Sequence, residues 1–218
     1  MSTITLLRGE VRADGVGKTI DTTTLVRPTT VKADPGQCVV LRGPNGSGKT
    51  TLLRMIGGLL EPTVGTATIG GTTADERNPV VRAAVAALTG TPTTYRDLTL
   101  IDHLVLVDST WGGDPNTSDD RGLGLMARLG IGHLHDRFPH ELSSGQEQLF
   151  RLALTFSRPS SVLLLDEPEQ RLDTSKRVTV TELIRERATS GGTVVMACHD
   201  PEMTAALAHH VVDVDPAR

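Results

Sequence analysis

Short runs of apolar and β-branched residues recur along this chain, and each is bounded by glycine or by charged residues. Such runs predict buried strands, because strands in globular domains are usually about five residues long and rich in these residue types. The runs occupy residues 37–43, 64–71, 162–166 and 193–198. Residues 2–15 predict a further strand that is followed by a turn.

Segments with helical spacing separate these runs. Residues 49–60 and 145–157 place apolar side chains three or four positions apart, which predicts amphipathic helices, and residues 174–190 predict a third helix. The inward faces are expected to comprise Leu52, Leu53, Ile56 and Leu59 or Leu60 in the first helix, and Leu149, Leu152, Ala153 and Phe156 in the second. Strands that alternate with helices imply an α/β fold with a parallel sheet.

The pattern changes between about residue 91 and residue 146. Residues 99–111 and 120–131 have helical spacing, and the segment between them is rich in Gly, Pro, Asn and Asp, which is typical of a loop. We predict that this block is a helical insertion. The 218 residues then form a single domain, with a core of about 1–90 and 147–218 and a helical subdomain of about 91–146.

Composition narrows the class of protein. The formal net charge of −4 argues against a general affinity for nucleic acid or anionic lipid. Cys38 and Cys198 both lie in apolar runs, which predicts buried free thiols and a reducing compartment. We find neither a signal peptide pattern nor an apolar stretch long enough to span a bilayer, so we expect a soluble chain that is brought to a membrane only by a partner.

The sequence GPNGSGKT, residues 43–50, matches the phosphate-binding pattern G-x-x-x-x-G-K-[ST] and lies between a predicted strand and a predicted helix. Its glycines allow backbone N–H groups to point at phosphate oxygens, and the helix N-terminus adds its positive dipole end. Lys49 is expected to reach the β- and γ-phosphates, and the Thr50 hydroxyl to take one position on Mg²⁺. A second G-K-T at residues 15–19 lacks the first glycine of the pattern and is predicted to be a loop.

Two adjacent carboxylates, Asp166 and Glu167, follow the apolar run at 162–166 directly. Two like charges at the end of a buried strand are costly unless positive charge lies nearby. Beside a phosphate loop, Mg²⁺ and Lys49 supply that charge. We therefore expect Asp166 to hold the metal, through a water, and Glu167 to polarise the water that attacks the γ-phosphate. The alternative is an ordinary strand that ends in a solvated turn.

Five motifs occur in a fixed order: GPNGSGKT, LSSGQ at 142–146, LLLDEP at 163–168, RLD at 171–173 and CHD at 198–200. In this order they resemble the ATP-binding subunit of an ABC transporter, and the LSSGQ signature is the most specific of them. The resemblance covers nearly the whole chain. It implies a P-loop NTPase fold with a RecA-like core, a β-rich edge sheet and an inserted helical subdomain that carries the signature.

The resemblance also implies a role for individual residues. ATP would be held by Gly43, Pro44, Asn45, Gly46, Ser47, Gly48, Lys49, Thr50 and Thr51, and its γ-phosphate would be capped by Ser143, Ser144, Gly145 and Gln146 of a second protomer. Thr50 and Asp166 would hold Mg²⁺. Glu167 would be the general base, Lys49 would act on the phosphates, and His199 would orient the attacking water. Leu172 and Asp173 would lie in a loop that crosses to the second protomer, and the remaining histidines are expected at the surface.

The chain departs from the family pattern at two places. The family usually has a glutamine between the core and the helical subdomain, but Gly90 or Thr89 stands there, and no Gln occurs between Gln37 and Gln146. The family also usually stacks an aromatic on adenine ahead of the phosphate loop. No aromatic precedes Tyr95 here, so Ile20 or another aliphatic would have to cover the base. With these two departures, the chain would hydrolyse ATP slowly or would be the weaker of two cassettes in an asymmetric pair.

The function expected from the resemblance is ATP hydrolysis that drives a separate transmembrane permease. The chain would work with a second cassette, identical or not, on the cytoplasmic face of the membrane. Residues 95–104 resemble exporter-type subunits, which favours export. Two alternatives remain open: a soluble ABC ATPase that acts on ribosomes or DNA, and a weakly hydrolysing regulatory cassette. The sequence does not distinguish a homodimer from a heterodimer.

Overall fold

A parallel sheet forms the centre of the protein. The structure, a computed structural model, describes residues 7–90 and 94–217. Within them the strands of this sheet follow the order β6-β7-β8-β3-β9. They are β3 (Cys38–Arg42), β6 (Val85–Leu88), β7 (Val162–Asp166), β8 (Thr193–Ala197) and β9 (His210–Asp213). The predictions for β3, β7 and β8 are confirmed. The strands β6 and β9 were not predicted, because both are four residues long and β6 continues directly from a helix.

An antiparallel sheet packs beside it, with the order β2-β1-β4-β5. Its strands are β1 (Val11–Ile20), β2 (Thr23–Ala33), β4 (Val64–Ile69) and β5 (Thr72–Thr73). The loop predicted at residues 15–19 is wrong. The turn predicted at the end of the segment 2–15 is also wrong, because β1 continues through both. Gly15 has a φ of +55° next to an irregularity in the pairing, so the glycine bends the strand without ending it. The first part of the predicted strand, residues 2–6, lies outside the described residues.

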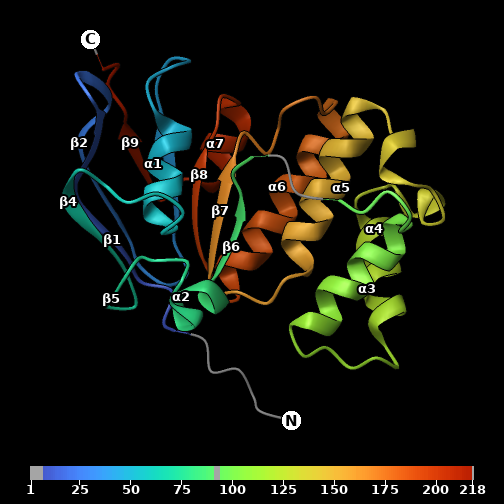
Figure 1. The fold of residues 1–218 in the computed structure, drawn as a ribbon. Coiled ribbons are helices and arrows are strands. Elements are labelled where there is room, and N and C mark those ends of the chain that lie inside the picture. The colour runs from blue at the N-terminus through green and yellow to red at the C-terminus, as the bar shows by residue number, and fades with distance from the viewer. Residues whose placement is uncertain (1–6, 91–93, 218) are drawn as a thin grey trace.

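Helices cover both faces of the parallel sheet (Figure 1). The helix α1 (Lys49–Ile56) lies between it and the antiparallel sheet, and α5 (Ser144–Ser157) and α6 (Thr174–Thr189) lie on the other side. Two short helices, α2 (Pro79–Ala84) and α7 (Pro201–Leu207), flank the sheet. The helix α1 stops before residue 60 because Gly57 and Gly58 follow it, with Gly58 at a φ of +74°. No helix in the described ranges is long and apolar enough to cross a membrane.

The strands divide their side chains between two apolar cores. Val39 and Leu41 face the core shared with α1 and the antiparallel sheet, whereas Val40 faces the core under α5 and α6. Period-2 alternation of this kind places residues of one strand on opposite faces. All four predicted inward residues of α5 are buried in the core under α5 and α6. Leu52, Leu53 and Ile56 of α1 are buried in the core that α1 shares with the antiparallel sheet. Cys38 and Cys198 are buried free thiols, as predicted.

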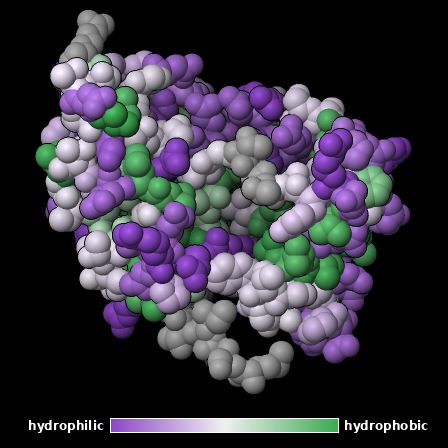
Figure 2. Space-filling view, viewed as in Figure 1, coloured by the Kyte–Doolittle hydropathy of each residue, from purple (hydrophilic) through white to green (hydrophobic). Residues whose placement is uncertain are grey.

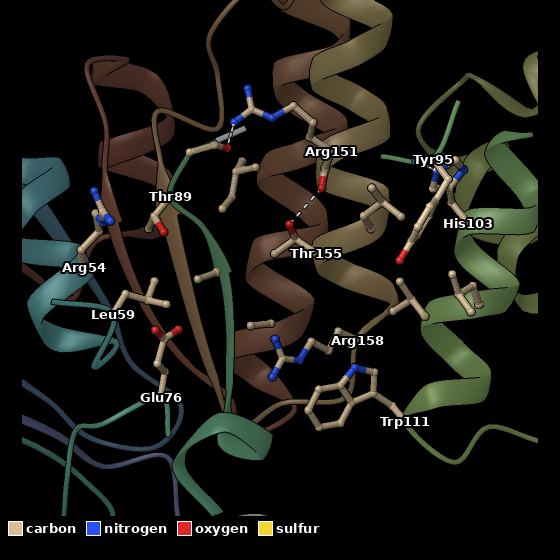
Figure 3. A pocket seen from close by; sticks show the side chains of 17 residues that line it. Arg54, Leu59, Glu76, Thr89, Tyr95, His103, Trp111, Arg151, Thr155 and Arg158 are labelled. Carbon is tan, nitrogen blue, oxygen red and sulfur yellow. Dashed lines mark hydrogen bonds between the residues drawn. The ribbon is translucent and has the colours of Figure 1, made fainter. Parts of the chain in front are cut away.

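A cavity of about 560 Å³ opens beside β6, between α1 and the helical block. It lies on the face shown in Figure 2, where apolar side chains gather around a hollow. Arg151 of α5 and Arg158, which directly follows that helix, line it together with Trp111 and Tyr95 (Figure 3). The Arg158 guanidinium lies 4.0 Å from the centre of the Trp111 ring, a cation–π contact that closes one end of the cavity.

The block between β6 and α5 contains α3 (Leu100–Thr110) and α4 (Ser118–Arg128), followed by short 3₁₀ turns at Gly132–Leu134 and Pro139–Glu141. Thr99 and Asp102 form a capping box that begins α3. His103 contradicts the expectation that the other histidines are at the surface. It is 3% exposed, and its Nε2 accepts a hydrogen bond from the Tyr95 N–H at 2.9 Å. The predicted division into a core and a subdomain at about 91–146 stays a proposal.

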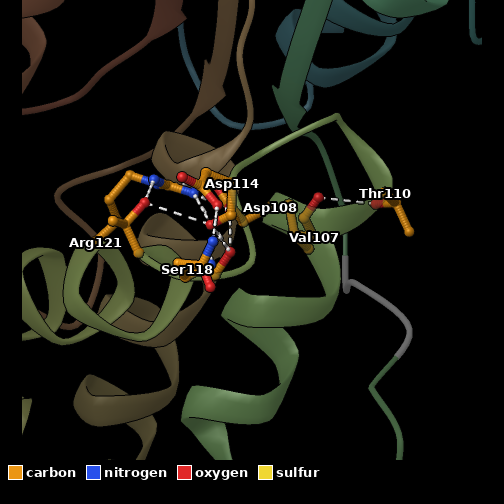
Figure 4. A network of polar contacts seen from close by, with 8 residues as sticks. Val107, Asp108, Thr110, Asp114, Ser118 and Arg121 are labelled. Carbon is orange, nitrogen blue, oxygen red and sulfur yellow. Dashed lines mark hydrogen bonds and ion pairs between the residues drawn. The ribbon is translucent and has the colours of Figure 1, made fainter. Parts of the chain in front are cut away.

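A polar network joins α3 to α4 (Figure 4). The Asp108 carboxylate, whose side chain is 15% exposed, accepts hydrogen bonds from the Arg121 guanidinium and from the Ser118 hydroxyl. Hydrogen bonds from Arg121 lower the pKa of Asp108, against an opposing effect of burial. A carboxylate with a lowered pKa contributes stability above the pKa of the unfolded chain, and this contribution is lost as the pH falls through the folded pKa.

We therefore expect Asp108→Asn to destabilise the protein by about 1 kcal/mol near neutral pH, because a charge-assisted contact is lost. The difference from wild type should shrink below about pH 4, where the unfolded carboxyl becomes protonated. Urea unfolding across this pH range measures it. Asp120→Asn, at an exposed position on α4, is the matched control. Equal effects of the two substitutions, or no dependence on pH, would contradict the role given to Asp108.

Candidate functional site

The phosphate loop lies at the carboxyl end of β3 and leads into α1. Gly46 and Gly48 have φ values of +80° and +94°, a backbone conformation that residues with a side chain rarely adopt. A Cβ on Gly48 would lie 2.5 Å from the Leu25 carbonyl oxygen, so no larger residue fits there. Gly48 also caps α1 without a side-chain hydrogen bond. The backbone N–H groups at the start of α1 are therefore free to bind an anion.

Lys49 lies under this loop and is 5% exposed. Its ammonium donates hydrogen bonds to the carbonyl oxygens of Gly43 at 2.8 Å and Pro44 at 3.1 Å. These bonds hold the positive charge inside the curve of the loop. Ser47 is fully buried, and its hydroxyl has no partner in the described residues. The loop therefore concentrates a cation, N–H donors and one unpaired hydroxyl in a small space.

Thr50, in the helix that follows β3, and Asp166, at the end of β7, meet at the same edge of the sheet. The Thr50 hydroxyl donates a hydrogen bond of 2.6 Å to one oxygen of Asp166. The other carboxylate oxygen, Oδ1, is buried and has no partner in the part of the chain that the structure describes. Burial raises the pKa of Asp166, and this outweighs the hydrogen bond from Thr50, which lowers it. Asp166 is thus a half-buried carboxylate, and one of its oxygens has no hydrogen-bond partner in the described residues.

Glu167 follows in a left-handed conformation, with a φ of +50°. Its N–H donates to the Ala197 carbonyl oxygen at the end of β8, at 2.9 Å. One carboxylate oxygen lies 3.4 Å from Nε2 of His199, and the other accepts a hydrogen bond of 2.9 Å from Gln170. The strained backbone turns this carboxylate toward His199, so the two adjacent acids have different neighbours.

The signature residues form the N-terminus of α5. Ser143 is its N-cap, and a capping box joins Ser143 to Gln146. Ser143 and Ser144 are exposed, whereas Gly145 lies against the Arg171 carbonyl oxygen. No hydrogen bond within the described ranges joins these residues to the phosphate loop. The fold of one chain therefore brings together Lys49, Thr50, Asp166, Glu167 and His199, and leaves the signature facing outward.

The loop after β7 has a local structural role. Asp173 is the N-cap of α6, where its carboxylate accepts a hydrogen bond of 2.9 Å from the Lys176 N–H. Leu172 is buried, at 5% exposed. Crossing of this loop to another protomer stays a prediction.

The two departures from the family pattern have a structural counterpart. Gly90 has a φ of +136°, and no described residue lies within 4 Å of the position of a Cβ, so a glutamine there would have a strained backbone. Ile20 lies at the end of β1 and is 50% exposed. It is available to cover a base, but no aromatic precedes Tyr95 to stack on one.

Sequence reasoning missed three polar residues at the site: Gln148, Glu169 and Gln170. Glu169 is 7% exposed and accepts a hydrogen bond of 2.6 Å from the N–H of His199. Gln148, 3% exposed, donates to the carbonyl oxygens of the segment after Asp166. The signal for Gln148 was its position two residues beyond the signature glutamine, on the buried side of a predicted helix.

Thr50 and Asp166 fit a Mg²⁺ ion that is bound together with a nucleotide. No group of three His, Cys, Asp or Glu side chains among residues 7–90 and 94–217 could hold a metal ion. A hydroxyl in contact with a carboxylate, beside a phosphate loop, supplies the hard oxygen ligands that Mg²⁺ takes in addition to phosphate oxygens. The unpaired Oδ1 of Asp166 supports this fit.

Comparison with known proteins identifies the family. The family model described as ABC transporter matches residues 26–170, about two thirds of the chain and all of the site up to Gln170. The chain belongs to the ABC transporter family. Among solved structures, an ATP-binding subunit of an ABC transporter has a TM-score of 0.85 at 24% identity, over 96% of this chain and 87% of that one. A bacterial ABC transporter cassette solved as a dimer has a TM-score of 0.83 at 21% identity, over 93% of this chain and 94% of that one. These two likenesses show the ABC cassette fold.

Curated relatives include an Fe(3+) ions import ATP-binding protein from Rhizobium etli and a sulfate/thiosulfate import ATP-binding protein from Brucella melitensis. They are 32% and 33% identical, and each alignment covers 96% of this ABC protein. The chain spans 59% of the length of each, and only about a third of the length of two Streptomyces relatives. Both relatives are named as import proteins, so the comparison gives no support to the expectation that this chain works in export.

The raised pKa of Asp166 leads to a testable consequence for stability. In the folded protein its charged form is disfavoured, so at pH values above the unfolded pKa of about 3.9 the buried charge costs stability. Asp166→Asn keeps an acceptor for the Thr50 hydroxyl and removes this charge. We expect it to raise the melting temperature of the nucleotide-free protein near pH 7, and the gain to shrink as the pH falls toward about 4.

Differential scanning fluorimetry from about pH 4 to pH 8 measures this gain and its decrease toward low pH. Asp173→Asn is a control, because hydrogen bonds from Ser175 and Lys176 lower the pKa of that carboxyl. It should therefore lose stability near pH 7. If Asp166→Asn also melts lower than wild type at every pH, the charge of Asp166 does not lower the stability of the nucleotide-free protein.

Proposed function

We propose that this ABC protein binds ATP with Mg²⁺, hydrolyses the γ-phosphate and thereby drives a separate transmembrane permease. The observation that carries the proposal is the convergence of Lys49, the Thr50–Asp166 contact and the Glu167–His199 pair at one edge of the sheet. A P-loop, a metal-binding hydroxyl and carboxylate, and a separate carboxylate for the water are the parts that phosphoryl transfer requires.

Each residue has a distinct role in the proposed reaction. N–H groups of residues 46–51 and the Lys49 ammonium bind the phosphates and neutralise negative charge that develops on them. Thr50 and Asp166 hold Mg²⁺, which when bound neutralises charge on the β- and γ-phosphate oxygens. Glu167 accepts a proton from the attacking water, and His199, 3.4 Å from it, orients that water. Glu169 holds the backbone of His199 in place.

The proposed reaction needs a second cassette, because Ser143 and Ser144 are exposed and make no hydrogen bond to the phosphate loop of their own chain within the described ranges. In the proposed assembly, the N–H groups at the start of α5 cap the γ-phosphate of ATP held by the partner cassette. The dimeric state of a solved cassette supports this arrangement. The assembly would lie at the cytoplasmic face of the membrane, attached through the permease. Since the relatives with a stated direction are import proteins, export is not part of the proposal.

The test is a comparison of two lysines that each belong to a G-K-T sequence. Lys49→Ala removes the cation inside the phosphate loop, and we expect ATP binding to weaken by at least tenfold and hydrolysis to be lost. Lys18→Ala is the matched control, because Lys18 lies in β1 and donates to the Glu61 carbonyl oxygen instead. It should retain activity within about twofold. Phosphate release and binding of a fluorescent ATP analogue measure both effects. Hydrolysis by Lys49→Ala at the wild-type rate would overturn the proposed site.

A further inference from the structure

A hydrogen-bonded chain of side chains runs from the cavity to the loop after β7. It begins at Arg151, which lines the cavity from α5 and donates to the Gly90 carbonyl oxygen at the end of the described segment 7–90 (Figure 3). The same guanidinium donates to Oε1 of Gln148 at 3.3 Å.

Gln148 continues this chain. Its Nε2 donates to the carbonyl oxygens of Glu167 at 3.2 Å and Pro168 at 3.4 Å. An amide has one acceptor end and one donor end, and Arg151 can only donate. The contact with Arg151 therefore fixes Oε1 toward the guanidinium and Nε2 toward the loop. Because Gln148 is 3% exposed, water does not compete strongly for either end.

The loop after β7, which accepts the hydrogen bonds from Gln148, contains a residue in an unfavourable backbone conformation. Glu167 has a φ of +50°, a conformation that a residue with a side chain rarely adopts unless its surroundings impose it. Its carbonyl oxygen accepts from Gln148 and from the Gln170 N–H at 3.1 Å. The orientation of this peptide decides where the Glu167 carboxylate points relative to His199.

We propose that Arg151 and Gln148 form a positioning pair that holds the Glu167 backbone in its left-handed conformation and ties it to the cavity wall at Gly90. This proposal rests on the proposed function in one respect, the catalytic use of Glu167. The pair provides a connection between cavity and site in a chain that has no glutamine between Gln37 and Gln146. Neither residue touches the substrate; both act through Glu167.

Three substitutions test the pair by ATP hydrolysis. Gln148→Met keeps the length of the side chain, Arg151→Met keeps an unbranched apolar stem, and both remove the hydrogen bonds. Each should lower kcat on the order of tenfold to a hundredfold, because the base is displaced, while KM for ATP stays within about twofold. Arg158→Met is the matched control: this arginine is the C-cap residue of the same helix and lines the same cavity, but donates to the Arg82 carbonyl oxygen. It should change kcat by less than about twofold.

The double variant Arg151→Met/Gln148→Met tests whether the two residues act as a unit. Its kcat should be no more than about twofold below that of Gln148→Met alone, because the first substitution already releases the loop. Multiplicative losses, an increase in KM that accounts for the loss, or an equal loss in Arg158→Met would overturn the proposal. Melting temperatures of all variants show whether any loss reflects unfolding.

Hydrogen–deuterium exchange separates this proposal from the proposed function, since it needs no hydrolysis. In the nucleotide-free protein, Arg151→Met should increase exchange severalfold in peptides covering residues 166–172 and leave residues 44–52 unchanged. Arg158→Met should alter neither. Unchanged exchange at 166–172 in Arg151→Met would overturn the positioning role. Increased exchange there in Arg151→Met, together with a wild-type protein that has no ATPase activity, would refute only the catalytic use of Glu167.

Discussion

The hydrogen bond between Thr50 and Asp166 joins the two strands on which the site depends. Thr50 belongs to the first turn of α1, after β3, and Asp166 ends β7, while β8 lies between these strands in the sheet. Carboxyl ends of parallel strands meet at one edge of a sheet. The register pairs Asp166 with Ala197 and Leu41 with Ala197, so the loops after β3, β7 and β8 begin at the same level. Every proposed catalytic side chain lies within two residues of such a strand end or in the phosphate loop.

Several groups around the phosphate loop make unfavourable interactions within the chain. Among the described residues, the buried Oδ1 of the half-buried Asp166 and the buried Ser47 hydroxyl have no hydrogen-bond partner, and Glu167 has a left-handed backbone. A fold selected for stability alone would remove each of these. Their coincidence around the phosphate loop is explained if a nucleotide and its metal provide the missing partners. The energetic cost is met by two apolar cores, one on each face of the parallel sheet.

The sequence predicts the central strands, the phosphate loop and the acid pair because local pattern and chemistry agree there. Residues 43–50 combine a strand, three glycines and a helix, and no other structure suits all of them. The loop predicted at residues 15–19 failed because Gly15 and Gly17 suggest a break, whereas pairing of β1 on both sides overrides that local preference. Gln148 and Arg151 escaped notice because side-chain hydrogen bonds between segments leave no periodic signal. The buried His103 was missed for the same reason.

The central claim is that the two adjacent acids have different tasks, Asp166 at the metal and Glu167 at the water. The most direct measurement is size-exclusion chromatography of Glu167→Gln and Asp166→Asn with ATP and Mg²⁺, combined with hydrolysis rates. Glu167→Gln should still bind ATP and lose about 10²–10⁴-fold in hydrolysis, the usual contribution of a general base. It should then elute as a dimer held by unspent ATP, whereas Asp166→Asn should bind ATP–Mg²⁺ weakly and stay monomeric. A Glu167→Gln protein that hydrolyses ATP at the wild-type rate and remains a monomer would contradict this account.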